Sequence, residues 1–134
     1  VVCFGGEEFS QEELSNFKKL KISKNLHYFS GLDSDLKQFY VNASVMVATS
    51  KYEGFGLPLV EAMSLGLPIA AFDCVFNRET TCGQALFFNS SDELGALLNS
   101  LDDDLVSKLG IKMKQLADQL YTWDKISSGY AGIF

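Results

Sequence analysis

Two carboxylates and two glycines lie close together in the sequence and could jointly hold a phosphorylated sugar. Glu53 comes directly before Gly54, and Glu61 follows the second glycine, Gly56. An ionised carboxylate only accepts hydrogen bonds, so Glu61 could accept two from vicinal hydroxyls such as those of a ribose, and Glu53 could accept from a second polyol. Because glycine lacks Cβ, a ligand could approach the backbone between the carboxylates closely. These residues predict a site for a diphosphate with a sugar at each end.

The elements on either side of this loop predict where that site lies. Residues 45–49 form an apolar, β-branched run that indicates a buried strand. A helix is predicted from Pro58, in its first position, to a Gly-then-Pro ending at residues 66–68. A strand, a glycine loop and a helix in this order direct backbone N–H groups and the positive helix end toward the carboxyl edge of a sheet. We therefore expect an anionic ligand at this loop.

Each of these features has a simpler interpretation when it is taken alone. A glutamate near a helix start, such as Glu61, usually only compensates the helix dipole at the surface. A Gly-x-Gly sequence is usually only a turn. The combination is what favours a binding site.

The composition is that of a globular chain with no sign of nucleic-acid binding. The 134 residues are 47% hydrophobic and 21% charged, and the net charge of −6 argues against a nucleic-acid or anionic membrane surface. Cys3, Cys74 and Cys82 have no metal-ligand spacing, and His27 is the sole histidine, so we predict no metal site and no histidine-based triad. The odd cysteine count and the lack of a membrane-span or signal pattern predict a cytoplasmic location.

Strands and helices alternate along the rest of the chain. Further strands are predicted over residues 1–4, 25–31, 68–72 and 83–88. Capping boxes, Ser10 with Glu13 and Ser90 with Glu93, predict helix starts, and so do the acidic run 102–104 and Thr122-Trp123. Alternating elements predict a Rossmann-like α/β fold of three layers with a parallel sheet, in one domain over residues 1–134. In such sheets ligands bind outside the carboxyl ends of the strands, where the glycine loop lies.

This stretch resembles the E-x7-E signature of the retaining group 1 glycosyltransferases (family 4 type), which have the GT-B fold. The resemblance rests on Glu53-Gly54-Phe55-Gly56-Leu57-Pro58, Glu61-Ala62-Met63 and residues 66–71. Other segments resemble the same family: 1–6, 25–31, 43–49, 77–88 and Thr122-Trp123. Gln84 stands where the family usually has Asp, and Ser44 where Asp is common, so the subfamily is not indicated.

The resemblance implies the C-terminal, donor-binding lobe of such an enzyme, without its first strand and helix. Glu61 would accept from the ribose hydroxyls of a nucleotide-diphosphate sugar, and Glu53 would contact the transferred sugar as the catalytic residue. The amides of Gly54, Phe55, Gly56 and Leu57 would meet the sugar and the diphosphate, and the base would lie near residues 29–32. The family retains the anomeric configuration and needs no metal; the nucleotide sugar is a substrate, and no cofactor is expected.

The resemblance also implies partners outside this chain. A saccharide or lipid-linked acceptor would be held by an N-terminal lobe, and basic residues that grip the diphosphate would precede Val1. Arg78 is expected to be structural. This lobe is expected to make no direct membrane contact, to be inactive alone, and to serve cell-surface polysaccharide synthesis. Two alternatives remain: a catalytically silent GT-B lobe acting as a binding or partner module, and an α/β domain that holds another phosphorylated ligand.

Overall fold

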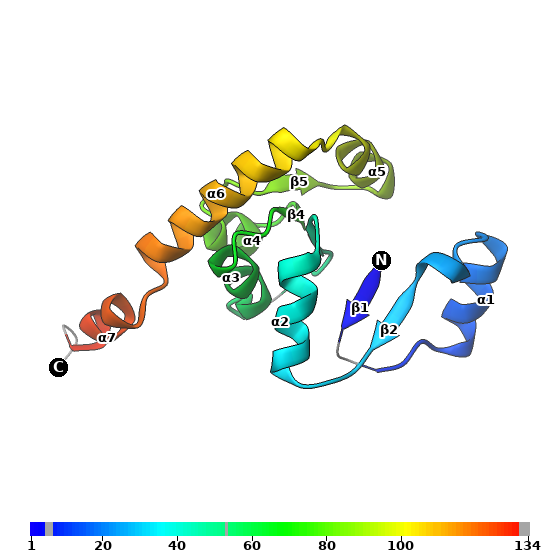
Figure 1. Cartoon of the computed structure of the whole chain (residues 1–134), viewed down its shortest axis with the longest axis horizontal. Helices are drawn as coiled ribbons and strands as arrows, with labels where there is room; N and C mark the ends of the chain where they lie inside the picture. Colours follow the sequence, from blue (N-terminus) through cyan, green and yellow to red (C-terminus); the bar gives the residue numbers. More distant parts are fainter. Residues whose placement is uncertain (5–6, 53, 132–134) are drawn as a thin grey trace. The chain divides into compact units, whose positions relative to one another are not determined.

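The computed structural model describes residues 1–4, 7–52 and 54–131. The chain divides into two compact units, Val1–Asn42 and Ala43–Phe134. Strands and helices alternate in both units, and every described strand pair is parallel, as the sequence predicts (Figure 1). The prediction of a single domain over residues 1–134 stays a prediction.

The first unit is a two-stranded sheet with two helices. Its elements are β1 (Val2–Phe4), α1 (Gln11–Lys19), a 3₁₀ turn η1 (Ser23–Asn25), β2 (His27–Phe29) and α2 (Asp33–Asn42). β2 is shorter than the strand predicted over residues 25–31, and Asn25, the first residue of that prediction, ends the 3₁₀ turn instead. The Ser10–Glu13 capping box is confirmed: the Glu13 carboxylate accepts from the Ser10 N–H at 2.8 Å, and the Ser10 hydroxyl accepts from the Glu13 N–H at 3.3 Å. Reciprocal caps of this kind satisfy two N–H groups at the helix start.

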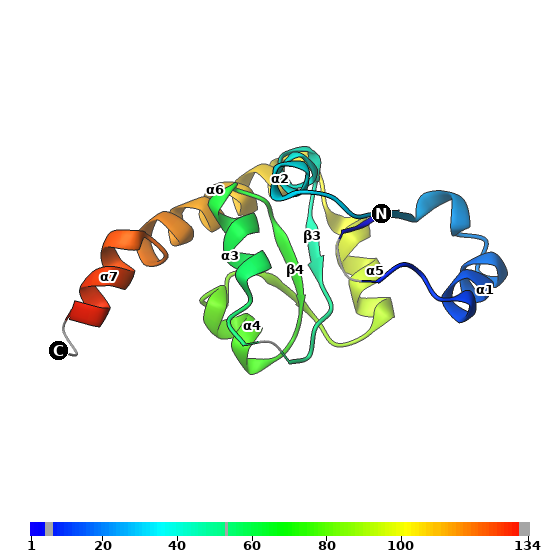
Figure 2. The same ribbon diagram turned by 90° about the horizontal axis from the view of Figure 1, so that it is seen from below.

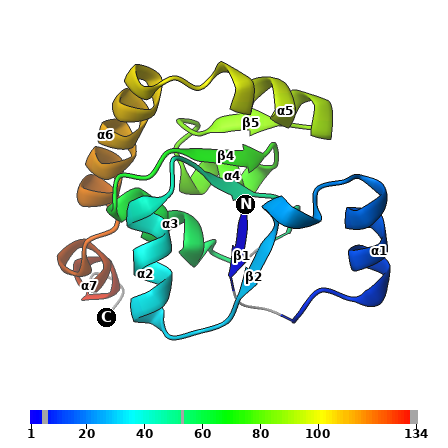
Figure 3. The same ribbon diagram turned by 45° about the vertical axis from the view of Figure 1, so that its right-hand side comes forward.

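The second unit has three strands and five helices. They are β3 (Met46–Ala48), α3 (Leu57–Ser64), β4 (Ile69–Phe72), α4 (Val75–Thr80), β5 (Leu86–Phe88), α5 (Ser91–Ser100), α6 (Asp103–Leu120) and α7 (Trp123–Ala131). The strand order is β3-β4-β5, with β3 beside β4 in Figure 2 and β4 beside β5 in Figure 3. The carboxyl ends of all three strands therefore lie at one edge of this sheet.

The core of the second unit lies between its sheet and the helices α3 and α6. Met63 on α3, Ile69 on β4 and Met113 on α6 are fully buried. The two helices meet closely where Gly110 of α6 approaches Gly66, and a Cβ on Gly110 would overlap the Gly66 carbonyl oxygen. The long helix α6 therefore packs closely against α3 and the residues that follow it.

Two local predictions differ from the structure. Ser90 does cap α5 by accepting from the Glu93 N–H at 3.2 Å, but the Glu93 carboxylate accepts from the Asn89 N–H at 2.7 Å instead of from Ser90. The Asn89 side chain also donates to the Glu93 carboxylate, at 3.5 Å, which favours bonding to Asn89 over Ser90. The second bond of a capping box is therefore missing. Pro58 occupies the second position of α3, since the helix begins at Leu57.

Within the described residues, none of the helices combines the length and apolar character that crossing a bilayer requires.

Candidate functional site

The candidate site is the segment 49–56, called the glycine loop below, which joins β3 to α3. It leaves the sheet at the carboxyl end of β3, beside the carboxyl end of β4 (Figure 2). Ligands of open parallel sheets bind at this edge. Glu53 lies outside the described residues, so the structure says nothing of the side chain predicted to be catalytic.

The two glycines of the loop differ in what they do. Gly56 has φ +73° and ψ 45°, and a Cβ there would lie 3.2 Å from Leu59 Cδ1. This left-handed conformation favours glycine and turns the chain into α3. Gly54 has open space around its Cα, with no atom within 4 Å of a built Cβ. Gly56 is therefore required by the turn, whereas Gly54 leaves room next to the backbone.

The start of α3 carries no side-chain cap. Gly56 is the N-cap residue and has no side chain that could bond to the N–H groups of the first turn. That turn also contains no acidic residue, and Glu61 begins the second turn, exposed to solvent. The N–H groups of Leu59 and Val60 donate to the Gly56 carbonyl, at 2.9 and 3.4 Å, and Pro58 has no N–H. The attraction of this helix end for anions therefore rests on the Leu57 N–H and the positive end of the helix dipole. The geometry therefore leaves this helix end available to a negatively charged ligand.

A cavity of about 190 Å³ lies against this loop. It is lined by residues 46–50 of β3 and the loop start, by Gly56, Pro58 and Leu59 at the start of α3, and by Asn77 of α4. Of the described residues that the sequence predicts for the site, Gly56 lines the cavity. Gly54, Phe55, Leu57 and Glu61 are exposed around the same loop and helix. The described residues that the sequence predicts for the site thus lie on the loop after β3 and on α3, and their role in binding stays a prediction.

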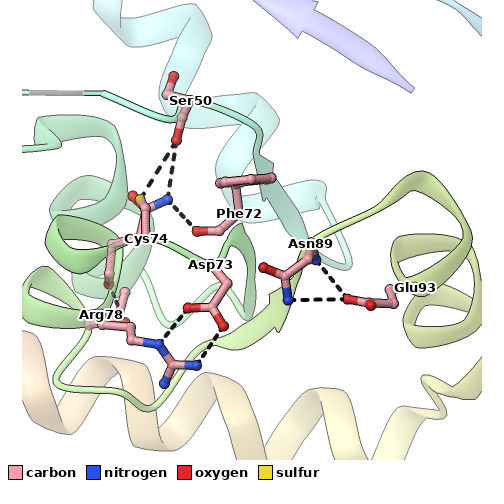
Figure 4. A network of polar contacts seen from close by, with 9 residues as sticks. Ser50, Phe72, Asp73, Cys74, Arg78, Asn89 and Glu93 are labelled. Carbon is pink, nitrogen blue, oxygen red and sulfur yellow. Dashed lines mark hydrogen bonds and ion pairs between the residues drawn. The ribbon is translucent and has the colours of Figure 1, made fainter.

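Helix α4 fastens both ends of the glycine loop. Asn77 is 1% exposed, and its Nδ2 donates to the carbonyl of Ser50 at 3.4 Å and to that of Phe72 at 2.8 Å. Thr80 Oγ1 donates to the carbonyl of Phe55 at 3.2 Å. Figure 4 shows the Ser50 and Phe72 carbonyls turned toward the same amide nitrogen. The sequence predicts no role in the site for Asn77 or Thr80, because burial and partners distant in the sequence leave no periodic signal.

An ion pair lies at the neighbouring strand end. Arg78 donates to both carboxylate oxygens of Asp73, at 2.5 and 2.7 Å (Figure 4). Its guanidinium lies 4.3 Å from the ring centre of Phe87. Hydrogen bonding from Arg78 lowers the pKa of the Asp73 carboxyl, and Asp73 in turn raises the pKa of Arg78. These contacts agree with the structural role predicted for Arg78, although the side chain is paired with a carboxylate and not merely solvated.

A second cation, Lys51, lies on the glycine loop itself. Lys51 Nζ lies 5.1 Å from the ring centre of Phe72, so this cation packs over an aromatic face. Across the part of the chain that the structure describes, no three His, Cys, Asp or Glu side chains gather as metal ligands would.

The family model for glycosyl transferases group 1 matches residues 1–107. The MMP alpha-(1->4)-mannosyltransferase of Mycolicibacterium hassiacum is 32% identical over 124 residues, which is 87% of this chain. The O-antigen chain mannosyltransferase B of Escherichia coli is 31% identical over 99 residues, or 72% of this chain. The chain spans 30% and 26% of the length of these two relatives.

The fold has counterparts among solved structures. The sucrose-phosphate synthase of Thermosynechococcus elongatus superposes with a TM-score of 0.83 at 21% identity, over 98% of this chain and 37% of that protein. At this identity the likeness shows the fold alone. It confirms the prediction of an α/β arrangement with parallel sheets like that of GT-B glycosyltransferases.

Proposed function

Because this chain belongs to the group 1 glycosyltransferases, we propose that it forms the donor-binding lobe of a retaining enzyme. The donor is a nucleotide-diphosphate sugar. The glycosyl group passes to a saccharide or lipid-linked acceptor that an N-terminal lobe holds. The fold alone would not support this function, since one fold hosts many activities.

One observation carries the proposal: the start of α3, whose N-cap Gly56 has no capping side chain, follows a glycine loop at the carboxyl edge of the sheet. Backbone N–H groups and the helix dipole there can meet the charge of a diphosphate without a metal ion. Gly56 sets the direction of the helix start through its left-handed conformation, and open space at Gly54 leaves the backbone accessible. Both features support close approach of an anionic ligand.

We assign the following roles on this basis. Glu61, exposed one turn into α3, accepts hydrogen bonds from the ribose hydroxyls. Glu53 contacts the transferred sugar and is the catalytic residue. Gly54, Phe55, Gly56 and Leu57 contribute backbone N–H groups. The Phe55 carbonyl accepts from Thr80 and its ring packs against Tyr121, so we assign the contact with the donor to its N–H group.

The biological setting is part of the same proposal. One relative is named for the O-antigen chain, which supports a role in cell-surface polysaccharide synthesis. We propose a cytoplasmic enzyme in which any attachment to the inner membrane face is made by the N-terminal lobe. The nucleotide sugar is a substrate, and no cofactor takes part.

Calorimetric titration of the full-length protein tests the donor site. UDP, GDP, ADP and their common sugar conjugates are titrated into the wild type, Glu61→Ala and the control Glu12→Ala. Glu12 is an exposed glutamate in the first turn of α1, remote in sequence from the glycine loop. We expect one nucleotide sugar to bind, and Glu61→Ala to lose about 1–3 kcal/mol of binding energy because ribose hydroxyls lose a charged acceptor. Glu12→Ala should bind like the wild type.

The other outcomes separate the alternatives. If no nucleotide binds at millimolar concentration, the transferase function fails and the silent-lobe interpretation replaces it. If bare nucleotides bind as well as nucleotide sugars and Glu61→Ala changes nothing, the loop holds another phosphorylated ligand.

Product analysis tests the chemistry. The anomeric configuration of the product, measured by NMR, should match that of the donor, and activity should persist in excess chelator. An inverted product would contradict the retaining mechanism.

A further inference from the structure

We propose that α4 holds the glycine loop ready for the donor, with Asn77 and Thr80 as positioning residues for the two ends of the loop. This inference rests on the proposed function, because it gives the loop a donor to receive. Neither side chain belongs to the residues expected to touch the donor. Each acts through a backbone carbonyl of the loop.

Asn77 fastens the start of the loop. A side-chain amide nitrogen carries two hydrogens, so Nδ2 can donate to two carbonyls at once. It does so to Phe72, the last residue of β4, at 2.8 Å and to Ser50, just after β3, at 3.4 Å. Cys74 Sγ lies 4.0 Å from the same Ser50 oxygen. The buried amide therefore joins two neighbouring strand ends beside the cavity.

Thr80 fastens the end of the loop. Its side chain, 7% exposed, donates to the Phe55 carbonyl, and its own carbonyl accepts from the Tyr121 hydroxyl at 2.8 Å. The rings of Phe55 and Tyr121 meet edge to face, with centroids 5.8 Å apart. Burial raises the pKa of Tyr121, so its hydroxyl keeps the proton that it donates at neutral pH. Thr80 thus links the loop to the end of α6.

The position of the two anchors explains why they matter for binding. Ser50 and Phe55 flank Glu53 in the sequence, and the described residues of the glycine loop belong to no helix or strand. Ordering such a segment when a ligand binds costs conformational entropy. Anchoring both flanking carbonyls before the donor arrives reduces that cost and keeps the reacting groups oriented.

Thr81 provides a matched control for Thr80. It is the next residue, it is fully buried, and its hydroxyl donates to the Asn77 carbonyl at 2.6 Å, inside the same turn of chain. Thr80→Val and Thr81→Val therefore delete the same group from neighbouring buried sites. The first removes a bond to the glycine loop, and the second removes a bond local to α4.

The experiment compares wild type, Thr80→Val, Thr80→Ser and Thr81→Val in the full-length protein. The affinities for UDP-glucose, GDP-mannose and ADP-glucose are measured by calorimetry, and stability is measured by urea unfolding. We expect Thr80→Val to weaken binding about 3- to 10-fold, as loss of one hydrogen bond predicts. Thr81→Val should weaken it less than about twofold at a similar loss of stability, and Thr80→Ser should restore binding. Asn77→Ala should act in the same direction as Thr80→Val, with a larger loss of stability.

Hydrogen exchange of the peptide that covers residues 50–60 provides a ligand-free measurement. Thr80→Val should speed exchange of the loop amides, whereas Thr81→Val should not.

Equal affinities and equal exchange rates in the two valine variants, or failure of Thr80→Ser to restore binding, would overturn the positioning role. If the wild type binds neither these three nor any other nucleotide or common nucleotide sugar at millimolar concentration, the proposed function fails, and with it the donor role of α4. The exchange comparison then still decides whether α4 holds the loop.

Discussion

The two units of the chain are stabilised by different kinds of contact. In Val1–Asn42 none of the described side chains is fully buried, and stacked and tilted rings of Phe4, Phe29 and Phe39 join the strands to α2. In Ala43–Phe134 the sheet packs on a fully buried core, and buried polar side chains of α4 bond to the end of β4 and to the glycine loop. A binding loop needs a rigid support, and the second unit provides one. The candidate site therefore depends on the packing of the second unit.

The largest expected effect is the loss of stability when a core side chain is truncated, which should differ between the two units. Met63→Ala should lower the free energy of unfolding by about 2–5 kcal/mol, because the fully buried side chain leaves a cavity between α3 and the sheet. Phe39→Ala in the first unit should cost less, since the ring is only half-buried. Urea unfolding of the full-length protein measures both values. A cost at Phe39 equal to that at Met63 would remove the distinction between the two cores.

A second prediction concerns the support behind α3. Gly110→Ala should destabilise the protein by about 1–3 kcal/mol, because its Cβ would overlap the Gly66 carbonyl oxygen and push α6 from α3. Urea unfolding checks this value.

Gly95→Ala is the matched control for this helix packing. Gly95 lies inside α5, where a built Cβ meets no atom within 4 Å. The same substitution should therefore stabilise the protein by about 0.5–1 kcal/mol, because alanine is the better helix former. A stability gain at Gly110 would show that α3 and α6 are not packed as described.

The sequence predicts the order of strands and helices in both units, because apolar periodicity and caps such as Ser10 with Glu13 are local signals. It also predicts that the glycine loop lies at a carboxyl strand end. It does not predict Asn77 or Thr80, whose partners are distant in the sequence, nor the contact of Gly110 with Gly66. Such contacts depend on how elements pack, which no local pattern specifies.

A third prediction separates the two glycines within the loop. Gly56→Ala should lower the free energy of unfolding by about 1–2 kcal/mol, because its φ of +73° strains a residue with a Cβ. Gly54→Ala should change stability by less than about 0.5 kcal/mol, since its surroundings are open. Its added methyl group should instead weaken nucleotide-sugar binding about tenfold. Unfolding and calorimetry of both variants check these values, and unchanged binding in Gly54→Ala would argue that the donor does not approach this backbone.

The smallest expected effect comes from the ion pair at the end of β4, which lies in the second unit but remains accessible to water. Arg78 lowers the pKa of Asp73, so the folded state holds the ionised carboxylate more strongly than the unfolded chain does. This stabilisation is fully present above the unfolded pKa of about 4, and is lost as the pH falls through the lower folded pKa. Asp73→Asn should therefore lower the free energy of unfolding at pH 7. The difference in this free energy between the variant and the wild type, measured by urea unfolding, should shrink as the pH is lowered below about 4. A difference that stays constant on acidification would mean that the carboxylate charge is not its source. Because Arg78 and Asp73 are 52% and 24% exposed, solvent screens the pair, and its loss should cost less than any change in the buried core.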